Sequence, residues 1–472
     1  MVTLKLYDSL SRSVQVFSPL ASSTSTGSVG VYSCGPTVYA RQHLGNMRPY
    51  VFADLLRRTL LSAGHAVKHV VNITDVGHLT SDADEGADKV ELAAARAHTS
   101  ALTITEHFTS LFQADLRRLN VLPPAVWAKA SAHVPEQIAM IRALEARGFT
   151  YRTTDGLYFD VSRAPHYGEL SGLRASAEHS RVAGAHGGHK RNAADFALWK
   201  FSPSDGPKRQ LEWDSPWGVG FPGWHIECSA MASKYLGDQF EIHTGGIDHV
   251  AVHHSNEIAQ AEHALEVRPW VKYWMHGAWL TMEGAKIAKS AGLAPNLDDL
   301  SAIDVSPIAF RYYLMTAHYR STLDLSLEAL RAAETGLDRL SQFVTRHGAE
   351  DGPLNAEAIA TSAIWRKQFY DALYDDLDAP RAIATLWCVV ADASLATGTR
   401  ARLVMELGEV LGLGFQSQAV TASPEISSLI ERREQARAAR DFSQADALRI
   451  ELWNHGYTVE DSPQGPLLRR AH

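Results

Sequence analysis

The sequence predicts an α/β protein built on a parallel sheet, followed by an all-helical region and a small C-terminal segment. Two strand-like runs, 29–33 and 68–72, flank a helical run at 47–63. The same alternation of strand and helix returns between residues 240 and 275, and from residue 326 onward only helical periodicity remains. Strand–helix–strand order indicates parallel strands joined by helical crossovers, so we expect a Rossmann-type catalytic domain interrupted by an insertion.

Each predicted element rests on its own pattern. Val29–Ser33 and Lys68–Asn72 are rich in β-branched residues and read as buried strands. Met47–Ala63 places apolar side chains at helical spacing. Farther along, two strands and the helix between them are expected at Phe240–His243, Trp270–Met275 and His253–Leu265.

Composition shifts divide the chain into four predicted units. The sheet domain is expected at 1–120 and 211–325, interrupted by an insertion at 121–210 that contains a Gly- and His-rich stretch. A helical bundle is expected at 326–414, with one apolar stripe formed by Leu330, Ala333, Leu337, Leu340 and Val344. A polar linker then leads to a C-terminal region, 424–472, where one arginine-rich helix is expected over Ile426–Trp453.

The composition favours a soluble globular protein of the cytoplasm. The 472 residues are 45% hydrophobic and 21% charged, with a formal net charge of −8. No signal peptide and no apolar run long enough for a membrane span are seen, and three widely separated cysteines argue against a disulfide framework. The acidic balance argues mildly against nonspecific nucleic-acid binding as the main role. We expect a monomer without a membrane partner.

Four residues form a candidate metal site. Cys34 ends the first strand, Cys228 lies in a Gly-Trp-His-Ile-Glu-Cys segment, and His253 and Glu257 are one helical turn apart. Two thiolates, an imidazole and a carboxylate suit Zn²⁺. The spacing alone leaves simpler explanations open, because buried cysteines usually pack as small apolar residues and a His/Glu pair often lies on a surface.

Two segments are candidates for phosphate binding. His43-Leu44-Gly45-Asn46 opens a helix, where free backbone N–H groups and the helix dipole favour anions. Lys286 and Lys289 lie on a Gly-flanked loop that could clamp developing phosphate charge. Taken singly, the first could be a turn and the second a surface lysine pair.

A smaller segment, Asn72-Ile73-Thr74-Asp75, closes the second strand. The carboxyl edge of an open α/β sheet is where ligands bind, although Thr and Asp at this position also fit a turn or helix cap.

Taken in order, these segments resemble one family, the cysteinyl-tRNA synthetases of class I. The resemblance is carried along essentially the whole chain by Cys34-Gly35-Pro36-Thr37, His43-Leu44-Gly45-Asn46, Asn72-Ile73-Thr74-Asp75, Gly223–Ala230, His253–Gln260 and Lys286–Ser290. The second and last of these look like variant forms of the class I HIGH and KMSKS signatures. Further matches lie in the insertion, the helical part and the C-terminal tail.

The resemblance implies a cysteine–tRNA ligase that activates L-cysteine with ATP and Mg²⁺ and transfers it to tRNA(Cys). Cys34, Cys228, His253 and Glu257 would hold one Zn²⁺ that selects the substrate thiol. Thr74, Trp224 and His243 would line the amino-acid pocket. His43, Gly45 and Asn46 would bind ATP, and Lys286 and Lys289 would close over it, with His43, Asn46 and both lysines contributing to catalysis. The C-terminal tail would bind the anticodon.

This chain departs from the family pattern at four places. Asn46 stands where the first signature usually ends in His, and Ile287-Ala288 replaces Met-Ser. Ala251-Val252-His253-His254-Ser255 replaces Phe-Pro-His-His-Glu, which keeps the candidate ligands but alters their surroundings. Leu468 replaces an aromatic residue before two arginines. These changes leave the rate and the anticodon contacts open. Two alternatives therefore stay in view: a cysteine ligase with a small-molecule amine acceptor, as in mycothiol synthesis, and a non-catalytic paralogue.

Overall fold

The structure is a computed structural model of the chain. It describes residues 3–21, 27–76, 79, 86, 88–172, 190–202, 209–287, 294–350, 355–415, 424–439, 441–455, 457–462 and 465–470. In this part of the chain, no helix is long and apolar enough to cross a membrane.

A five-stranded parallel sheet in the order β11-β10-β3-β4-β5 forms the centre of the protein. Its strands are β3 (Val29–Ser33), β4 (Val67–Ile73), β5 (Val126–Lys129), β10 (Phe240–Gly246) and β11 (Val271–Gly277). The order runs outward in one direction from β3 to β5 and in the other from β10 to β11. Ligands of open α/β sheets bind where the order reverses, so this topology places the site at the carboxyl ends of β3 and β10.

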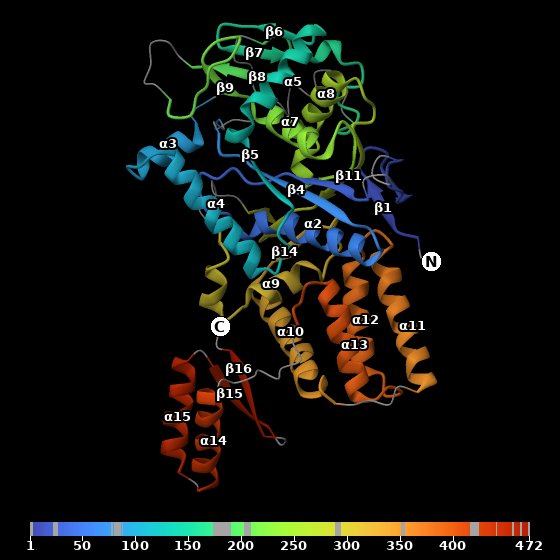
Figure 1. Cartoon of the computed structure of the whole chain (residues 1–472), viewed down its shortest axis with the longest axis vertical. Coiled ribbons are helices and arrows are strands. Elements are labelled where there is room, and N and C mark those ends of the chain that lie inside the picture. The colour runs from blue at the N-terminus through green and yellow to red at the C-terminus, as the bar shows by residue number, and fades with distance from the viewer. Residues whose placement is uncertain are drawn as a thin grey trace.

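The predicted α/β sheet is confirmed, and helices cover both of its faces (Figure 1). Helix α2 (Leu44–Ser62) packs on one face, against β4, β10 and β11. Helices α7 (Trp224–Leu236), α8 (His253–Leu265) and α5 (Val134–Ala146) lie together on the other. Helix α8 has the predicted bounds, whereas α2 begins three residues before the predicted Met47, at the residue after His43.

Two further groups of elements surround the sheet. Helices α3 (Lys89–Arg96) and α4 (Ala101–Arg118) connect β4 to β5. An antiparallel sheet with the order β6-β7-β8-β9 lies at the end of the molecule opposite the C-terminal unit (Figure 1). Its strands are β6 (Thr150–Arg152), β7 (Gly156–Phe159), β8 (Phe196–Phe201) and β9 (Gly220–Pro222). The Gly- and His-rich stretch expected in the insertion lies outside the described residues, and the domain limits remain predictions.

Short strands complete the catalytic half. A hairpin of β1 (Lys5–Asp8) and β2 (Ser13–Val16) packs beside β11. After β11, the strands β12 (Leu280–Met282), β13 (Ala285–Lys286) and β14 (Leu323–Leu325) form a small sheet. This small sheet places the segment that carries Lys286 next to the start of α2.

The helical region packs directly on the catalytic half. It contains α9 (Pro307–Leu314), α10 (Leu327–His347), α11 (Ala356–Leu373), α12 (Ala379–Ala391) and α13 (Thr397–Val410). The apolar stripe predicted for α10 is buried at all five positions. At the junction, the wholly buried Arg311 of α9 bonds Asp54 of α2 at 2.5 Å, and Arg58 bonds the same carboxylate at 2.8 Å. Removing one partner of such a buried pair is strongly destabilising.

The C-terminal region corrects one prediction. In place of a single helix, the structure has α14 (Pro424–Ala438) and α15 (Phe442–Asn454), which pack side by side. A hairpin of β15 (Tyr457–Ser462) and β16 (Gly465–Arg470) follows. The break has a local cause, because the Asp441 side chain accepts a hydrogen bond from the Gln444 backbone N–H at 3.0 Å and caps a new helix there.

Candidate active site

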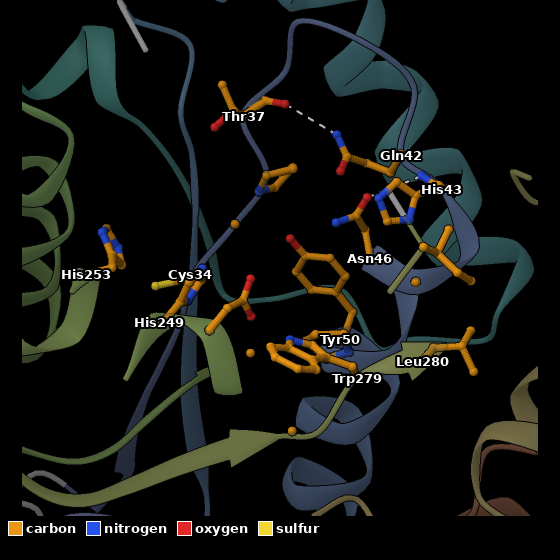
Figure 2. Close-up of a pocket in the computed structure, with 18 of the residues that line it drawn as sticks. Cys34, Thr37, Gln42, His43, Asn46, Tyr50, His249, His253, Trp279 and Leu280 are labelled. Atoms are coloured by element: carbon orange, nitrogen blue, oxygen red, sulfur yellow. Dashed lines mark hydrogen bonds between the residues drawn. The ribbon is translucent and has the colours of Figure 1, made fainter. Parts of the chain in front are cut away.

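A cleft of about 650 Å³ opens at the carboxyl edge of the sheet, where β3 and β10 diverge. Cys34 and Gly35 follow β3, Gly246 ends β10 and Asp248 lies just beyond it, and Gly277 ends β11. Figure 2 shows Cys34, His249 and His253 at one end of the cleft and His43 and Asn46 at the other. The two ends carry different chemistry and are described in turn.

The four residues predicted to bind metal meet at the first end. Cys34 comes from the end of β3, Cys228 from α7, and His253 and Glu257 from the first turns of α8. Their ligand atoms all lie within 4.8 Å of one another, and the residues are 8%, 1%, 2% and 0% exposed. Burial of this many polar groups is costly unless they bind one another or a metal.

Two other histidines hold the candidate ligands in place. Nδ1 of His225 lies 2.9 Å from Nδ1 of His253, and Nε2 of His243 lies 2.8 Å from Oε2 of Glu257. Each contact leaves the opposite atom of the ligand, His253 Nε2 or Glu257 Oε1, directed toward the cluster, and these two atoms lie 2.8 Å apart. Such outer partners fix the orientation of metal ligands.

The local electrostatics favour a cation. Burial by itself would raise the pKa of Cys228, but a hydrogen bond from Cys34 and the adjacent His253 bring that pKa to about 6. Burial likewise opposes ionisation of Glu257, yet His243 and His253 hold its pKa below the usual range. Burial and Cys228 raise the pKa of Cys34, and Glu257 outweighs burial to raise that of His253 to about 10. One thiolate and one carboxylate are therefore present even without a metal.

A second set of close donors, Cys34, His243, His254 and Glu257, shares two members with the first. In this set the Nε2 atom of His243 is already bonded to Glu257, and Nδ1 of His254 lies 2.7 Å from Nε2 of His276. Cys34, Cys228 and His253 line the cleft, whereas His243 and His254 are absent from its described lining. The first set is the one that a ligand in the cleft can reach, and its two sulfurs, one nitrogen and one oxygen fit Zn²⁺.

The other end of the cleft is the start of α2. His43 is the residue before the helix, and its backbone N–H donates to Oδ1 of Asn46 at 3.3 Å. With its oxygen used in this way, the amide NH₂ of Asn46 is the group that can donate to an anion in the cleft. A Cβ atom on Gly45 would lie 3.0 Å from the His43 ring and 3.4 Å from Ile287. Gly45 thus keeps the helix start accessible.

Lys286 also lines the cleft, in the segment that contacts this helix start. Its Nζ is 3.0 Å from Oδ2 of Asp248 and 5.1 Å from the centre of the Trp279 ring. The next residue, Ile287, is buried against Gly45 and so anchors the segment at the cleft. Lys289 lies outside the described residues.

The three residues expected in the amino-acid pocket occupy different positions. Trp224 lines the cleft and stacks on His253, with ring centres 4.2 Å apart. Thr74 and His243 are buried behind the described lining: the Thr74 hydroxyl accepts from Asn72 at 3.2 Å, and His243 supports Glu257.

Sequence reasoning missed several residues of the site. His225 lies three residues before Cys228, in the same segment, and this helical spacing was an available signal. Asp248 directly follows a strand at the ligand-binding edge, which also could have marked it. The contacts of His254 and His276 join residues from α8 and β11, and no local pattern indicates them.

Comparison with known sequences shows two family matches. The model described as "tRNA synthetases class I (C) catalytic domain" matches residues 20–335, and "Cysteinyl-tRNA ligase anticodon binding domain" matches residues 421–466. The chain is 48% identical to a Burkholderia lata protein named cysteine--tRNA ligase 1, over 98% of this chain and 96% of that protein. It is 38% identical to the cysteine--tRNA ligase of Treponema denticola, over 98% of each.

Solved structures share the fold at low identity. A Mycobacterium tuberculosis methionyl-tRNA synthetase in complex with methionyl-adenylate aligns with a TM-score of 0.57 and 14% identity, covering 82% of this chain and 89% of that one. An Agrobacterium radiobacter LeuRS in a complex with tRNA and LeuAMS aligns with a TM-score of 0.59 and 12% identity, covering 82% and 84%.

Proposed function

Since this chain belongs to the cysteine–tRNA ligases, a family of class I aminoacyl-tRNA synthetases, we propose that its cleft activates L-cysteine with ATP and transfers it to tRNA(Cys). The observation that carries the proposal is that one cleft has two chemically different ends. A buried thiol-, imidazole- and carboxylate-bearing cluster lies at one end, and a helix start suited to phosphate lies at the other.

At the first end, Cys34, Cys228, His253 and Glu257 would hold Zn²⁺. A zinc ion there supplies a soft site that a substrate thiolate binds well and a serine hydroxyl binds poorly. Trp224 would pack over the bound amino acid beside His253. Thr74 and His243 would act from behind the cleft lining. The backbone N–H of Thr74 donates to the carbonyl of Pro36 at 3.1 Å, so Thr74 would fix the end of its strand. His243 would orient Glu257.

At the second end, the residues position ATP for attack of the cysteine carboxylate on the α-phosphate, with pyrophosphate leaving. The backbone N–H groups that open α2, the Asn46 amide and His43 would stabilise the charge that develops on phosphate. Lys286 would exchange Asp248 for phosphate, and Lys289 would join it. Mg²⁺ would accompany the nucleotide. A ribose hydroxyl at the 3′ end of tRNA would then attack the carbonyl carbon of the adenylate, forming the ester as AMP leaves. In both steps, positioning and charge stabilisation would carry most of the acceleration.

The acceptor favoured by these findings is tRNA rather than a small amine. Residues 421–466 match the anticodon-binding model, and the structure forms a separate helix pair and hairpin there. We propose that this unit contacts the anticodon, that the protein acts as a monomer, and that it works in the cytoplasm. No observation favours a non-catalytic paralogue, because His43, Asn46 and Lys286 all border the cleft.

The test has two stages. Zinc-loaded protein should catalyse cysteine-dependent exchange of pyrophosphate into ATP without tRNA, and should then charge tRNA(Cys) but not glucosaminyl-inositol. Absence of exchange would reject both ligase functions, and charging of the amine in preference to tRNA would reject the proposed acceptor.

A further inference from the structure

Arg48 is a buried cation on α2 with no role in the chemistry described above. It lies two residues after Asn46 and is 3% exposed. Burial lowers its pKa to about 10. A guanidinium in such a place is costly unless its donors are fully used.

The guanidinium of Arg48 is satisfied by backbone carbonyl oxygens. Nη1 donates to Ala278 at 3.0 Å and also to Trp279, while Nη2 donates to Ser321 at 2.5 Å and to His318 at 3.3 Å. The planar guanidinium has N–H donors in fixed directions, so it can bond carbonyls of two separate segments at once. A lysine ammonium lacks this fixed geometry.

The two arginines deeper in the same junction are held differently. Arg58 and Arg311 both bond the carboxylate of Asp54, so an acidic side chain balances part of their charge. The described hydrogen bonds of Arg48 run only to main-chain oxygens. Arg48 therefore fixes the backbone of the segment between β11 and β12.

That segment forms a wall of the cleft. Ala278, Trp279 and Leu280 line it, and the Trp279 ring lies under Lys286. Figure 2 shows Trp279 and Leu280 below His43 and Asn46, with the Tyr50 ring between Asn46 and Trp279. The same wall is fixed to the turn before β14, because Ala278 N–H donates to Tyr319 and Leu323 N–H to Trp279. Arg48 thus joins the first turns of α2 to the Ala278–Leu280 wall of the cleft.

We propose that Arg48 is a positioning residue for the nucleotide: it fixes the separation between the first turn of α2 and the Ala278–Leu280 wall, and so sets the affinity for ATP without affecting the thiol end. The inference rests on the proposed function in taking ATP as the ligand of this end. The contacts of Arg48 lie away from Cys34, Cys228, His253 and Glu257, so zinc and cysteine binding should not sense its loss.

The experiment compares Arg48→Lys with Arg58→Lys, a control on the same helix with a similarly buried side chain that bonds Asp54, Glu409 and Asn120 instead of the cleft wall. Titration calorimetry measures ATP binding without turnover, and pyrophosphate exchange gives KM for ATP and for cysteine. Arg48→Lys should weaken ATP binding and raise KM for ATP about tenfold, since small misplacements of binding groups have effects of this size or larger. Zinc content and KM for cysteine should stay at the wild-type level.

Arg58→Lys should lower thermal stability while leaving ATP affinity unchanged. Equal weakening of ATP binding in both variants would show a general loosening of α2 and overturn the proposal, as would unchanged ATP affinity in folded Arg48→Lys. If Arg48→Lys does not fold, Arg48→Gln removes the buried charge and should weaken ATP binding in the same way. Absence of pyrophosphate exchange in the wild type would reject the proposed ligase function. The calorimetric comparison of ATP binding would still decide whether Arg48 positions the nucleotide.

Discussion

The two ends of the cleft are built in opposite ways. At the thiol end, the four candidate ligands are at most 8% exposed and come from β3, α7 and α8, and further histidines hold two of them. At the phosphate end, the Lys286–Asp248 pair has side chains 48% and 44% exposed, and His43 and Asn46 belong to one helix start.

This difference matches the demands that the proposed function makes on each end. Selecting sulfur over oxygen requires ligands that cannot relax around the wrong substrate, and burial with outer hydrogen bonds supplies that rigidity. Binding and releasing a triphosphate requires groups that can exchange partners, and an exposed ion pair is weak enough to do so. The sequence departures Asn46 and Ile287 fall at the phosphate end. At the thiol end, Ala251-Val252 and Ser255 alter the surroundings of His253, but the four candidate ligands are kept.

The largest expected effect is at the thiol end. Cys228→Ser should abolish stoichiometric zinc binding and reduce cysteine activation by more than about 100-fold, since even outer-shell changes cost metal sites 10- to 100-fold. Elemental analysis and pyrophosphate exchange measure the two effects. Cys388→Ser, at an exposed cysteine of the helical region, is the control and should change neither. Full zinc retention in Cys228→Ser would remove Cys228 from the ligand set.

A smaller effect is expected at the phosphate end. Asn46→Ala removes an amide donor and should lower kcat for exchange about 100-fold, the usual effect of losing one donor to developing charge. Zinc content should not change. Asn46→His, which restores the usual family residue, should keep most of the activity. Normal exchange by Asn46→Ala would show that the helix start is not where the phosphate charge develops.

The smallest effect concerns the protons at the thiol end. At neutral pH, the raised pKa values of Cys34 and His253 keep both protonated without metal, whereas Cys228, with a pKa of about 6, and Glu257 are already ionised. Because ligands bind zinc deprotonated, zinc should displace about two protons and its affinity should rise with pH. Calorimetry in buffers of different ionisation enthalpy counts the protons. Release of none would show that different groups bind the metal.

The fold was predictable where pattern and burial agree. β3 and α8 have their predicted bounds because each is a short run with a strong period or continuous burial. The start of α2 was placed too late because His43–Asn46 carries no apolar period, since it faces a ligand site. The division of the tail at Asp441 was missed although its capping signal is local, because helical periodicity continues on both sides.

The site was predictable only in part. Local motifs and the family resemblance identified candidate site residues that belong to short sequence segments. Arg48, His254 and His276 act through partners from other elements, Arg48 on carbonyls 230 or more residues away in the chain. Sequence spacing carries no information on which buried polar groups meet across elements.

We propose that a buried metal site, rather than pocket shape, selects cysteine over serine. The most direct measurement is kcat/KM for charging of tRNA(Cys) with cysteine and with serine, using zinc-loaded protein and a chelated sample. The zinc-loaded protein should prefer cysteine by more than about 10⁴-fold, well beyond the roughly 100-fold that pocket shape achieves against near-isosteres. A preference near 100-fold that is the same with and without zinc would contradict the claim.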